Sequence, residues 1–543
     1  MDKRWRSWRE EDKPVYPTDE AEQEKRLRDD PQLKDFRALR QSMKDDPLRP
    51  IYHFVRPDGY LNDPNGLCFW EGRWHLFYQA CDEVIHWGHA VSEDLVFWRD
   101  LPFAIYPKYE DHCFSGGTCV DKENHRVIAA YYGYTGYDLE TGYRCGTVLA
   151  TSSDPLLLNW TKVNGGRPVI PDADAPCWTP PDTPPVKGQK PYQVFDSYIW
   201  KENGVYYLLE GGYTLHPKTK RRFRQVHLFR CMDDSLLNWE YQKPFLEHDR
   251  FREPGDDGAC PYFMPIGDGK RLFMHFSHRC APKYLIGDYD ASSLEFFPFN
   301  GGRITSGYWT LVAPSAFPCP DGSVAVLFNM LEGRRHNGWS GVMTLPRRLT
   351  LGGVWGDELR QAPFADYSKL HGEHRRLTGI FLEKGKMQVL PEMQGNAFEM
   401  DITLRPEDIP PVLEIGILRS PDGEEVTRIA FFRQKGGGYA VLPCTNDSVI
   451  MLDTTHACKD PENTLLPEIA AVVMEKDEPL RVRVFADKSI VEVFVNDSQC
   501  VSQRAYPLRP DSVGISLLAQ GGSAVVDNID FWTMLPIFPN GEK

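Results

Sequence analysis

An aspartate in a turn-like segment is the first residue whose setting suits chemistry. Asp63 lies in the run Asn-Asp-Pro-Asn-Gly at 62–66, and Asn-Asp-Pro and Asn-Gly are both typical of β-turns. Apolar or aromatic residues flank the run, and an alternating strand pattern follows at 73–79. The pattern predicts either an ordinary turn or a carboxylate held between rigid turn residues at the edge of a β-core, where it is placed to act on a substrate.

The composition is that of a large globular protein. The chain has 543 residues, of which 41% are hydrophobic and 12% aromatic, enough for two or three domains. Its formal charge of -15 at pH 7 leaves no basic face for nucleic acid or an anionic membrane. No apolar run approaches the roughly 20 residues of a membrane span, and the N-terminal residues lack the apolar core of a signal peptide. We therefore expect a cytoplasmic protein without nucleic-acid or membrane partners; the oligomeric state is not predicted.

The cysteines and the motifs give no sign of a metal or a cofactor. The thirteen cysteines include no Cys-x-x-Cys pair, which favours reduced, mostly buried thiols over a disulfide framework or a zinc site. Neither a His-Glu-x-x-His motif, a phosphate-binding glycine loop nor a dinucleotide fingerprint occurs. We expect chemistry by side chains alone.

The chain divides into a charged start and two regions of strands. Residues 1–48 are highly charged, and 19–43 has few helix breakers apart from Pro31, which predicts one or two solvated helices in an extension packed against the main domain. A polar connection near 361–374 separates the two strand regions, and the second contains strand patterns at 397–404, 480–485 and 489–497. In the first region a turn followed by an aromatic, β-branched strand recurs five times, which suits a β-propeller or a large sandwich. The copies lie at 71–77, 124–131, 203–209, 268–274 and 321–327.

Several motifs together resemble glycoside hydrolase family 32, the β-fructofuranosidases. The family's opening motif stands unchanged at 62–66, and 86–98, 114–117 and 338–347 resemble its Trp-Gly-His, Phe-Ser-Gly and late propeller segments. The resemblance implies an all-β fold, with a five-bladed β-propeller over 49–365 and a β-sandwich over 366–543, behind the helical extension. It also implies a carbohydrate substrate, namely a fructo-oligosaccharide, fructan or related furanoside, and no cofactor.

The resemblance also implies three catalytic roles. Asp63 would be the nucleophile that forms a covalent fructosyl-enzyme, and Asp196, in Phe-Asp-Ser where the family has Arg-Asp-Pro, would stabilise the transition state. Retention needs a second carboxyl group about 5 to 5.5 Å from the nucleophile to donate a proton. The family carries this Glu before a Cys, but the chain has Ala259 there.

Asp257 is the predicted replacement, because residues two apart in an extended segment share a face. Asp256, Glu253 and Glu210 are the next candidates. Two alternatives stay open: Asp-Asp-Gly at 256–258 is ordinary turn chemistry, and an inactivating replacement of Glu by Ala259 would leave the same sequence.

Five further residues are expected to bind substrate. They are Asn62, Gln79, Trp87, Phe114 and Ser115. Gln79 and Ser115 resemble polar substrate contacts of the family, whereas the aromatic residues, with Trp70 and Tyr198, could stack on a sugar or fill blade cores.

Two other functions remain open at this point. In fructosyl transfer or cyclisation, a sugar hydroxyl would outcompete water for the same intermediate. A sugar-binding protein with a decayed active site would explain the missing Glu and Arg.

Overall fold

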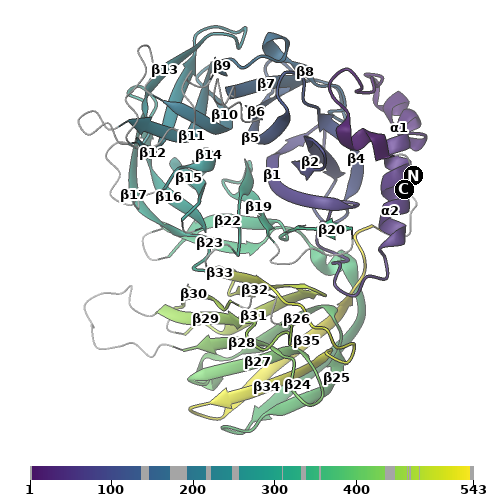
Figure 1. Ribbon diagram of the computed structural model, residues 1–543. Coiled ribbons are helices and arrows are strands. Elements are labelled where there is room, and N and C mark those ends of the chain that lie inside the picture. The colour runs from purple at the N-terminus through teal and green to yellow at the C-terminus, as the bar shows by residue number, and fades with distance from the viewer. Residues whose placement is uncertain are drawn as a thin grey trace. The chain divides into compact units, whose positions relative to one another are not determined.

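The computed structural model describes residues 3–135, 146–171, 192–215, 222–246, 256–279, 281–307, 310–331, 338–353, 356–433, 447–460, 463, 466–475 and 477–538. The chain forms two compact units, which are drawn in Figure 1. The first comprises Met1–Gln41, Arg56–Ile304 and Val312–Asn329. The second comprises Ser42–Val55, Thr305–Leu311 and Met330–Lys543.

The first unit contains the propeller blades, in which neighbouring strands follow each other in the chain and pair antiparallel. Its strands are β1 (Gly59–Trp70), β2 (Arg73–Cys81), β3 (Ile85–Ser92), β4 (Arg99–Ile105), β5 (His112–Asp121), β6 (Arg126–Tyr134), β7 (Gly146–Ser152), β8 (Thr161–Lys162), β9 (Ile170–Pro171), β10 (Gln193–Glu202), β11 (Val205–Leu215), β12 (Arg222–Cys231), β13 (Trp239–Pro244), β14 (Ala259–Ile266), β15 (Lys270–Ser277), β16 (Ala281–Asp290), β17 (Glu295–Arg303), β18 (Pro314–Pro318) and β19 (Val324–Met330). A 3-10 turn, η2 (Val163–Gly166), follows β8.

Five inner strands form the centre of the propeller. β1 contacts β5, β5 contacts β10, β10 contacts β14, β14 contacts β18, and β18 contacts β1, which closes a ring. Figure 1 shows the blades arranged around this centre. The predicted five-bladed β-propeller is confirmed, and the ring brings residues far apart in sequence to one place.

The five sequence repeats are the turns that join each inner strand to the second strand of its blade. They lead into β2, β6, β11, β15 and β19. Gly72 and Gly204 have φ of 77° and 78°, and the residues before them, Glu71 and Asn203, also have positive φ. Two successive residues with positive φ make a type I′ turn, which matches the twist of antiparallel strands.

The Asn-Asp-Pro-Asn-Gly run is not a turn between strands, which corrects that expectation. It lies inside the inner strand β1. Pairing of β1 with β2 shifts register between Leu61 and Pro64 and again between Asn65 and Cys68. These bulges accommodate turn-forming residues within a strand, including a proline that has no N–H to donate.

Two helices form the N-terminal extension, as predicted. They are α1 (Glu20–Arg28), with Asp19 capping its N-terminus, and α2 (Pro31–Ser42), after the short turn η1 (Lys3–Ser7). Asp30 caps α2 by accepting hydrogen bonds from the N–H groups of Gln32 and Leu33 at 2.9 and 3.1 Å. Proline is favoured in the first turn, where its missing N–H costs nothing.

The extension is packed on the first blade as well as solvated. Phe36 of α2 is buried, with ring centroids 5.3 Å from Trp5 and 5.8 Å from Phe103. Arg40 forms two hydrogen bonds with Asp100, at 2.6 and 2.8 Å. The apolar face of α2 is therefore part of the core of this unit.

Replacing Phe36 with leucine tests this packing. Two aromatic pairs worth about 0.5 to 1.5 kcal/mol each are lost, so we expect destabilisation of about 1 to 3 kcal/mol. Urea unfolding followed by tryptophan fluorescence measures it. Phe97→Leu is the matched control, because Phe97 is already 38% exposed, and it should change stability by less than about 0.5 kcal/mol. Equal effects of the two substitutions would contradict the packing role of Phe36.

The second unit contains the predicted β-sandwich. One sheet has the order β24-β35-β26-β31-β32-β33 and the other β25-β34-β27-β28-β29-β30. Alternate residues of both sheets form one apolar core, for example Phe398, Met400 and Ile402 of β26. The strands of these two sheets are β24 (His371–Leu382), β25 (Gln388–Gln394), β26 (Ala397–Leu404), β27 (Val412–Arg419), β28 (Thr427–Phe432), β29 (Asp447–Asp453), β30 (Glu468–Val473), β31 (Leu480–Asp487), β32 (Ile490–Val495), β33 (Gln499–Arg504), β34 (Gly514–Gln520) and β35 (Ala524–Met534). Four strands that precede the sandwich in the chain belong to other sheets: β20 (Trp339–Ser340), β21 (Val342–Met343), β22 (Arg347–Gly352) and β23 (Glu358–Pro363).

The stretch expected to be a polar connection is largely structured. The end of β23, the 3-10 turn η3 (Tyr367–Leu370) and the start of β24 occupy 361–374. A second 3-10 turn, η4 (Pro406–Asp408), follows β26. Tyr367 and Leu370 of η3 are buried, so apolar side chains anchor the stretch despite its polar composition.

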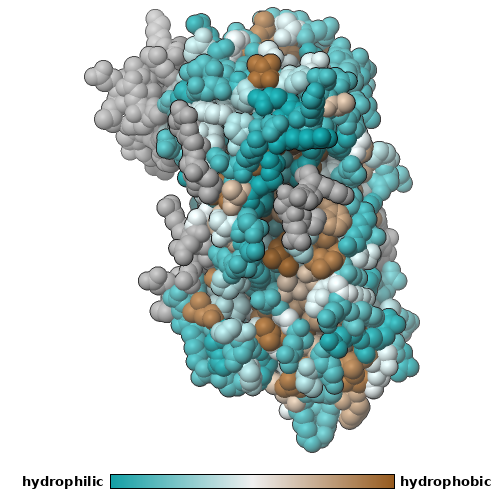
Figure 2. Space-filling view, turned by 90° about the vertical axis from the view of Figure 1, so that its right-hand side faces the viewer, coloured by the Kyte–Doolittle hydropathy of each residue, from teal (hydrophilic) through white to brown (hydrophobic). Residues whose placement is uncertain are grey.

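The surface, the helices and the cysteines agree with a globular β-protein. Most residues on the face drawn in Figure 2 are hydrophilic, with apolar residues in small groups. Within the described ranges, no helix has the length and apolarity to span a bilayer. The nine cysteines that the structure describes are all free, and seven of them are buried.

Candidate active site

Asp63 accepts hydrogen bonds from polar side chains of three strands, β2, β5 and β19. Its Oδ2 accepts hydrogen bonds from Ser115 Oγ at 2.6 Å and Gln79 Nε2 at 3.4 Å. Its Oδ1 accepts from Asn329 Nδ2 at 3.4 Å. The Asn62 amide joins the same network, donating to Gln79 Oε1 at 2.9 Å and accepting from Asn329 at 3.2 Å. The carboxylate is thus fixed in orientation while remaining partly exposed.

Each inner strand that supplies a site residue is irregular at that residue. Asp196 lies at a bulge in β10 with φ of 47°, and Cys260 lies at a bulge in β14 with φ of 46°. Ser115 lies at a register shift in β5. Bulges re-aim side chains, and non-glycine residues at positive φ are costly. Together with β1, which carries Asp63, the strands β5, β10 and β14 therefore deviate from regular pairing at their site residues.

Asp63 and Asp196 meet at one thiol. Cys260 Sγ lies 3.8 Å from Asp63 Oδ2 and 3.5 Å from Asp196 Oδ2, and the Cys260 N–H donates to the same Asp196 oxygen at 3.1 Å. Burial, followed by the charges of both aspartates, raises the pKa of the thiol well above its usual range. The thiol therefore stays protonated and can donate to either carboxylate.

The two carboxylates perturb each other. Burial raises the pKa of Asp63 despite the hydrogen bond from Ser115. Burial and then the charge of Asp63 raise the pKa of Asp196 to about 7. Two neighbouring carboxylates repel each other when both are ionised. A positively charged group between them relieves this repulsion and is therefore stabilised. An oxocarbenium-like transition state has that charge.

A cluster of ionisable side chains surrounds Asp257. Its buried carboxylate accepts from Arg224 Nη1 at 2.5 Å and from His278 Nδ1 at 2.6 Å. Asp256, the neighbouring residue, pairs instead with Lys283 at 2.6 Å. Glu210 is buried and accepts from a serine of β10. Glu253, the remaining candidate, lies outside the described residues.

Comparison with known proteins identifies this arrangement. The model of the glycosyl hydrolases family 32 N-terminal domain matches residues 53–363, and that of the family 32 C-terminal domain matches residues 368–533. The chain belongs to glycosyl hydrolase family 32. This membership makes it a glycosidase of the β-fructofuranosidase type.

Relatives of this family 32 member resemble it over most of its length. Sucrose-6-phosphate hydrolase from Escherichia coli is 26% identical over 516 residues, which cover 89% of this chain and 94% of that protein. Levanase from Bacillus subtilis is 25% identical, covering 93% of this chain and 74% of the levanase. The crystal structure of fructan 1-exohydrolase IIa from Cichorium intybus has a TM-score of 0.72 at 21% identity, covering 90% of this chain and 98% of that one.

The aromatic residues near the site of this family 32 member differ in exposure. Trp87 is completely buried and its Nε1 donates to the Phe114 carbonyl at 2.8 Å, so its indole fills the core and supports the neighbouring strand. Trp70 and Tyr198 are buried too. Phe114 is partly exposed and stacks on Tyr134 with centroids 4.8 Å apart. Of these four predicted aromatics, Phe114 alone offers a surface to a ligand.

The sequence analysis missed four residues of this site: Asn329, Arg224, His278 and Cys260. A signal for the first existed, because Asn329 follows its turn glycine, Gly322, by seven residues, as Gln79 follows Gly72. Aligning the repeats would have placed Asn329 beside Asp63. Its own Oδ1 accepts from the Ala313 N–H at 2.9 Å, which turns the amide nitrogen toward the carboxylate.

Proposed function

We propose that this protein hydrolyses β-fructofuranosides with retention of configuration, with Asp63 as nucleophile. The observation that carries the proposal is the contact of one thiol with the carboxylates of both Asp63 and Asp196. Asp63 attacks C2 of the fructosyl group and forms an ester, which water then cleaves. The hydrogen bonds from Ser115, Gln79 and Asn329 orient the attacking oxygen.

Asp196 is proposed to stabilise the cationic transition state and to bind sugar hydroxyls. Its pKa of about 7 means that it carries substantial negative charge at neutral pH, and a developing positive charge nearby would increase this ionisation. Asn62, Gln79 and Ser115 are proposed to bind the fructosyl hydroxyls, and Phe114 to border the neighbouring sugar.

The proton that the leaving oxygen needs is proposed to come from the group formed by Asp257, His278 and Arg224. Ala259 has no titratable group. Asp257 lies two residues before it in the chain and binds Arg224 of β12 and His278, which follows β15. The presence of an ordered charged group beside the altered position favours an enzyme over a decayed binding protein.

Fructans and their short oligosaccharides are the proposed substrates. One relative of known structure, fructan 1-exohydrolase IIa from Cichorium intybus, was solved in complex with 1-kestose, and a Bombyx mori β-fructofuranosidase with sucrose. The alignments with these two structures cover 90% and 95% of this chain, respectively.

Product analysis tests the proposal. The protein is incubated with sucrose, 1-kestose, inulin and levan, and the sugars are separated by chromatography. Free fructose is expected, and added methanol should trap methyl β-fructofuranoside, the product of retention. Longer or anhydro-sugars would instead indicate transfer or cyclisation. Calorimetric binding without turnover would indicate a sugar-binding protein.

A cytoplasmic location is also proposed. The nine described cysteines are free, as is usual in a reducing compartment. Disulfides in the protein isolated from its own cells, with thiols blocked at lysis, would contradict this location.

A further inference from the structure

A histidine follows the strand that pairs with Ala259. Ala259 pairs with Phe276 across β14 and β15. Asp257 precedes β14 by two residues and His278 follows β15 directly, so both lie just beyond the paired ends of these strands. Their hydrogen bond of 2.6 Å shows that they meet.

Asp257 is fixed and fully engaged by cationic partners. Its side chain is 1% exposed, and its carboxylate binds both Arg224 and His278. Its carbonyl accepts from the Gly212 N–H at 3.2 Å, which ties this segment to the third blade. A carboxylate in this setting is better suited to orient its partners than to reach a sugar.

His278 is more accessible and interacts electrostatically with the two catalytic carboxylates. Its side chain is 45% exposed. Its charge acts on both Asp63 and Asp196, lowering their pKa values against the larger effect of burial. Because Nδ1 donates to Asp257, Nε2 is the ring nitrogen that can exchange a proton with a ligand.

We propose that His278 is the catalytic acid and base of this enzyme, oriented by Asp257 as a positioning residue. This deepens the proposed function and rests on it. In the first step the bond between C2 and the glycosidic oxygen breaks, the bond between C2 and an Asp63 oxygen forms, and the Nε2 proton moves to the leaving oxygen. In the second step neutral Nε2 takes a proton from water, the water oxygen bonds to C2, and Asp63 leaves as a carboxylate.

The charges around His278 suit this role. Burial lowers the pKa of His278, but the hydrogen bond and charge of Asp257, and then the charge of Asp196, raise it above its ordinary value, while Arg224 opposes them. A donor whose pKa lies near the working pH is efficient in both directions of proton transfer. Among the described residues, Asp257, Arg224, Asp196 and Asp63 are charged groups that interact with His278.

Leaving-group dependence tests the proposal. His278→Gln is compared with the parent on sucrose, whose alkoxide needs a proton, and on β-fructosyl fluoride, whose fluoride leaves without one. We expect kcat/KM on sucrose to fall by about 10² to 10⁴, and on the fluoride by less than about tenfold. The sucrose activity of the parent should decline at high pH as His278 loses its proton. The residual sucrose activity of His278→Gln should not show this decline.

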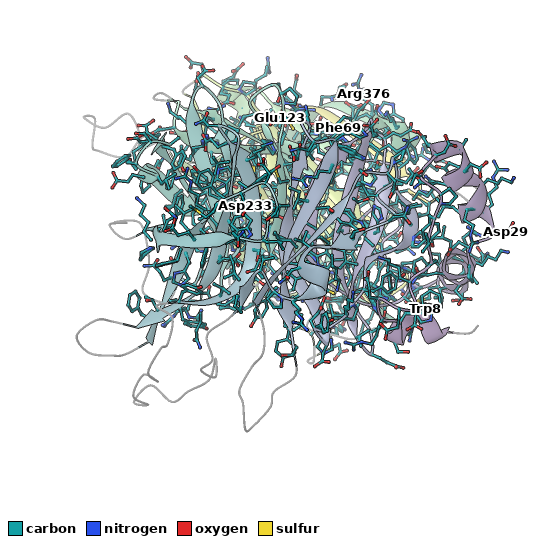
Figure 3. The ribbon with its side chains drawn as sticks, turned by 90° about the horizontal axis from the view of Figure 1, so that it is seen from above. Trp8, Asp29, Phe69, Glu123, Asp233 and Arg376 are labelled. Atoms are coloured by element: carbon teal, nitrogen blue, oxygen red, sulfur yellow. The ribbon has the colours of Figure 1, made fainter. Side chains whose placement is uncertain are left out.

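Two further variants serve as comparison and control. Asp257→Asn should lose less sucrose activity than His278→Gln, and its decline at high pH should begin at lower pH, because the imidazolium loses its carboxylate partner. His125→Gln is the matched control and should retain full activity, because His125 is 68% exposed in the β5–β6 turn, at the opposite end of β5 from Ser115. Figure 3 labels Glu123, which lies in the same turn.

The outcomes separate this inference from the proposed function. Sucrose activity of a folded His278→Gln variant within about threefold of the parent, or equal losses on the two substrates, would overturn the role of His278 alone. A larger loss in Asp257→Asn than in His278→Gln, with its pH profile unshifted, would make Asp257 the donor. No fructose from any fructoside with the parent protein would overturn the proposed function itself. Thermal melting of each variant confirms that it is folded.

Discussion

Asp63→Asn is expected to abolish turnover while leaving the protein folded and able to bind sugar. An amide cannot attack C2 to form the ester intermediate, so kcat should fall by at least about 10⁴-fold, as when a nucleophile is removed from other covalent enzymes. Asparagine has one acceptor oxygen, which at the Oδ2 position can still accept from Ser115 and Gln79, whereas the hydrogen bond from Asn329 to Oδ1 is lost. Initial rates on sucrose and calorimetric binding of 1-kestose measure the two effects.

The same substitution should stabilise the protein at alkaline pH. Asp63 and Asp196 both have raised pKa values, so the folded state binds protons that the unfolded chain, with aspartate near 3.9, has released. Stability from these groups is therefore present at low pH and declines as pH rises toward about 7, the pKa of Asp196. Removing the charge of Asp63 removes part of this loss of stability. The melting temperature of Asp63→Asn should therefore be higher than that of the parent, and the difference should be larger at pH 8 than at pH 5.

Asp233→Asn is the matched control for this experiment. Asp233 is exposed in a turn, where it accepts from the Ser235 N–H at 2.9 Å, and Figure 3 labels it. Turnover should be unchanged, and the melting difference should not grow between pH 5 and pH 8. Turnover by Asp63→Asn within about tenfold of the parent would eliminate Asp63 as the nucleophile.

Local sequence was sufficient for the blades and insufficient for the site. Each blade turn carries its own residue pattern, such as Asn203-Gly204 before β11, so periodicity and turn chemistry predicted the repeats. The Asn-Asp-Pro-Asn-Gly run was placed in a turn by the same local rule. Pairing with β2 on one side and packing against β5 overrode it, and the run became a bulged strand.

The missed residues are those whose role depends on long-range contacts. His278 follows β15 and Arg224 lies in β12, and their partner Asp257 is 21 and 33 residues away in sequence. Nothing in the residues around His278 distinguishes it from a strand-end histidine. Asp257 was found because it is near the altered motif, whereas the histidine became visible only with strand register.

The second large effect is expected in the second unit, on its stability. Arg347 is completely buried and donates to Glu492 Oε2 at 2.7 Å, Ser502 Oγ at 2.7 Å and Gln361 Oε1 at 2.8 Å. Glu492 also accepts from the Leu345 N–H at 2.6 Å. Arg347→Leu would leave this carboxylate buried without its guanidinium, which should destabilise the unit by about 3 to 5 kcal/mol.

The pH dependence identifies the cause of that loss. Although burial raises the pKa of Glu492, the charge of Arg347 and the hydrogen bond from His53 lower it to about 2. A lowered pKa gives stability that is full above the unfolded value of about 4.3 and is lost as pH falls toward 2. Urea unfolding of the parent should therefore show stability falling between about pH 5 and pH 2, and Arg347→Leu should show a smaller fall.

A double substitution separates the lost ion pair from lost packing. Arg347→Leu combined with Glu492→Leu removes both buried charges, and buried pairs replaced by apolar side chains often recover most of the stability, so the double variant should be more stable than Arg347→Leu alone. Arg348→Leu is the neighbouring control: Arg348 is partly exposed and lies 4.6 Å from the Phe364 ring, so its loss should cost about 1 kcal/mol or less. If the double variant is no more stable than the single one, the stranded carboxylate is not what destabilises Arg347→Leu.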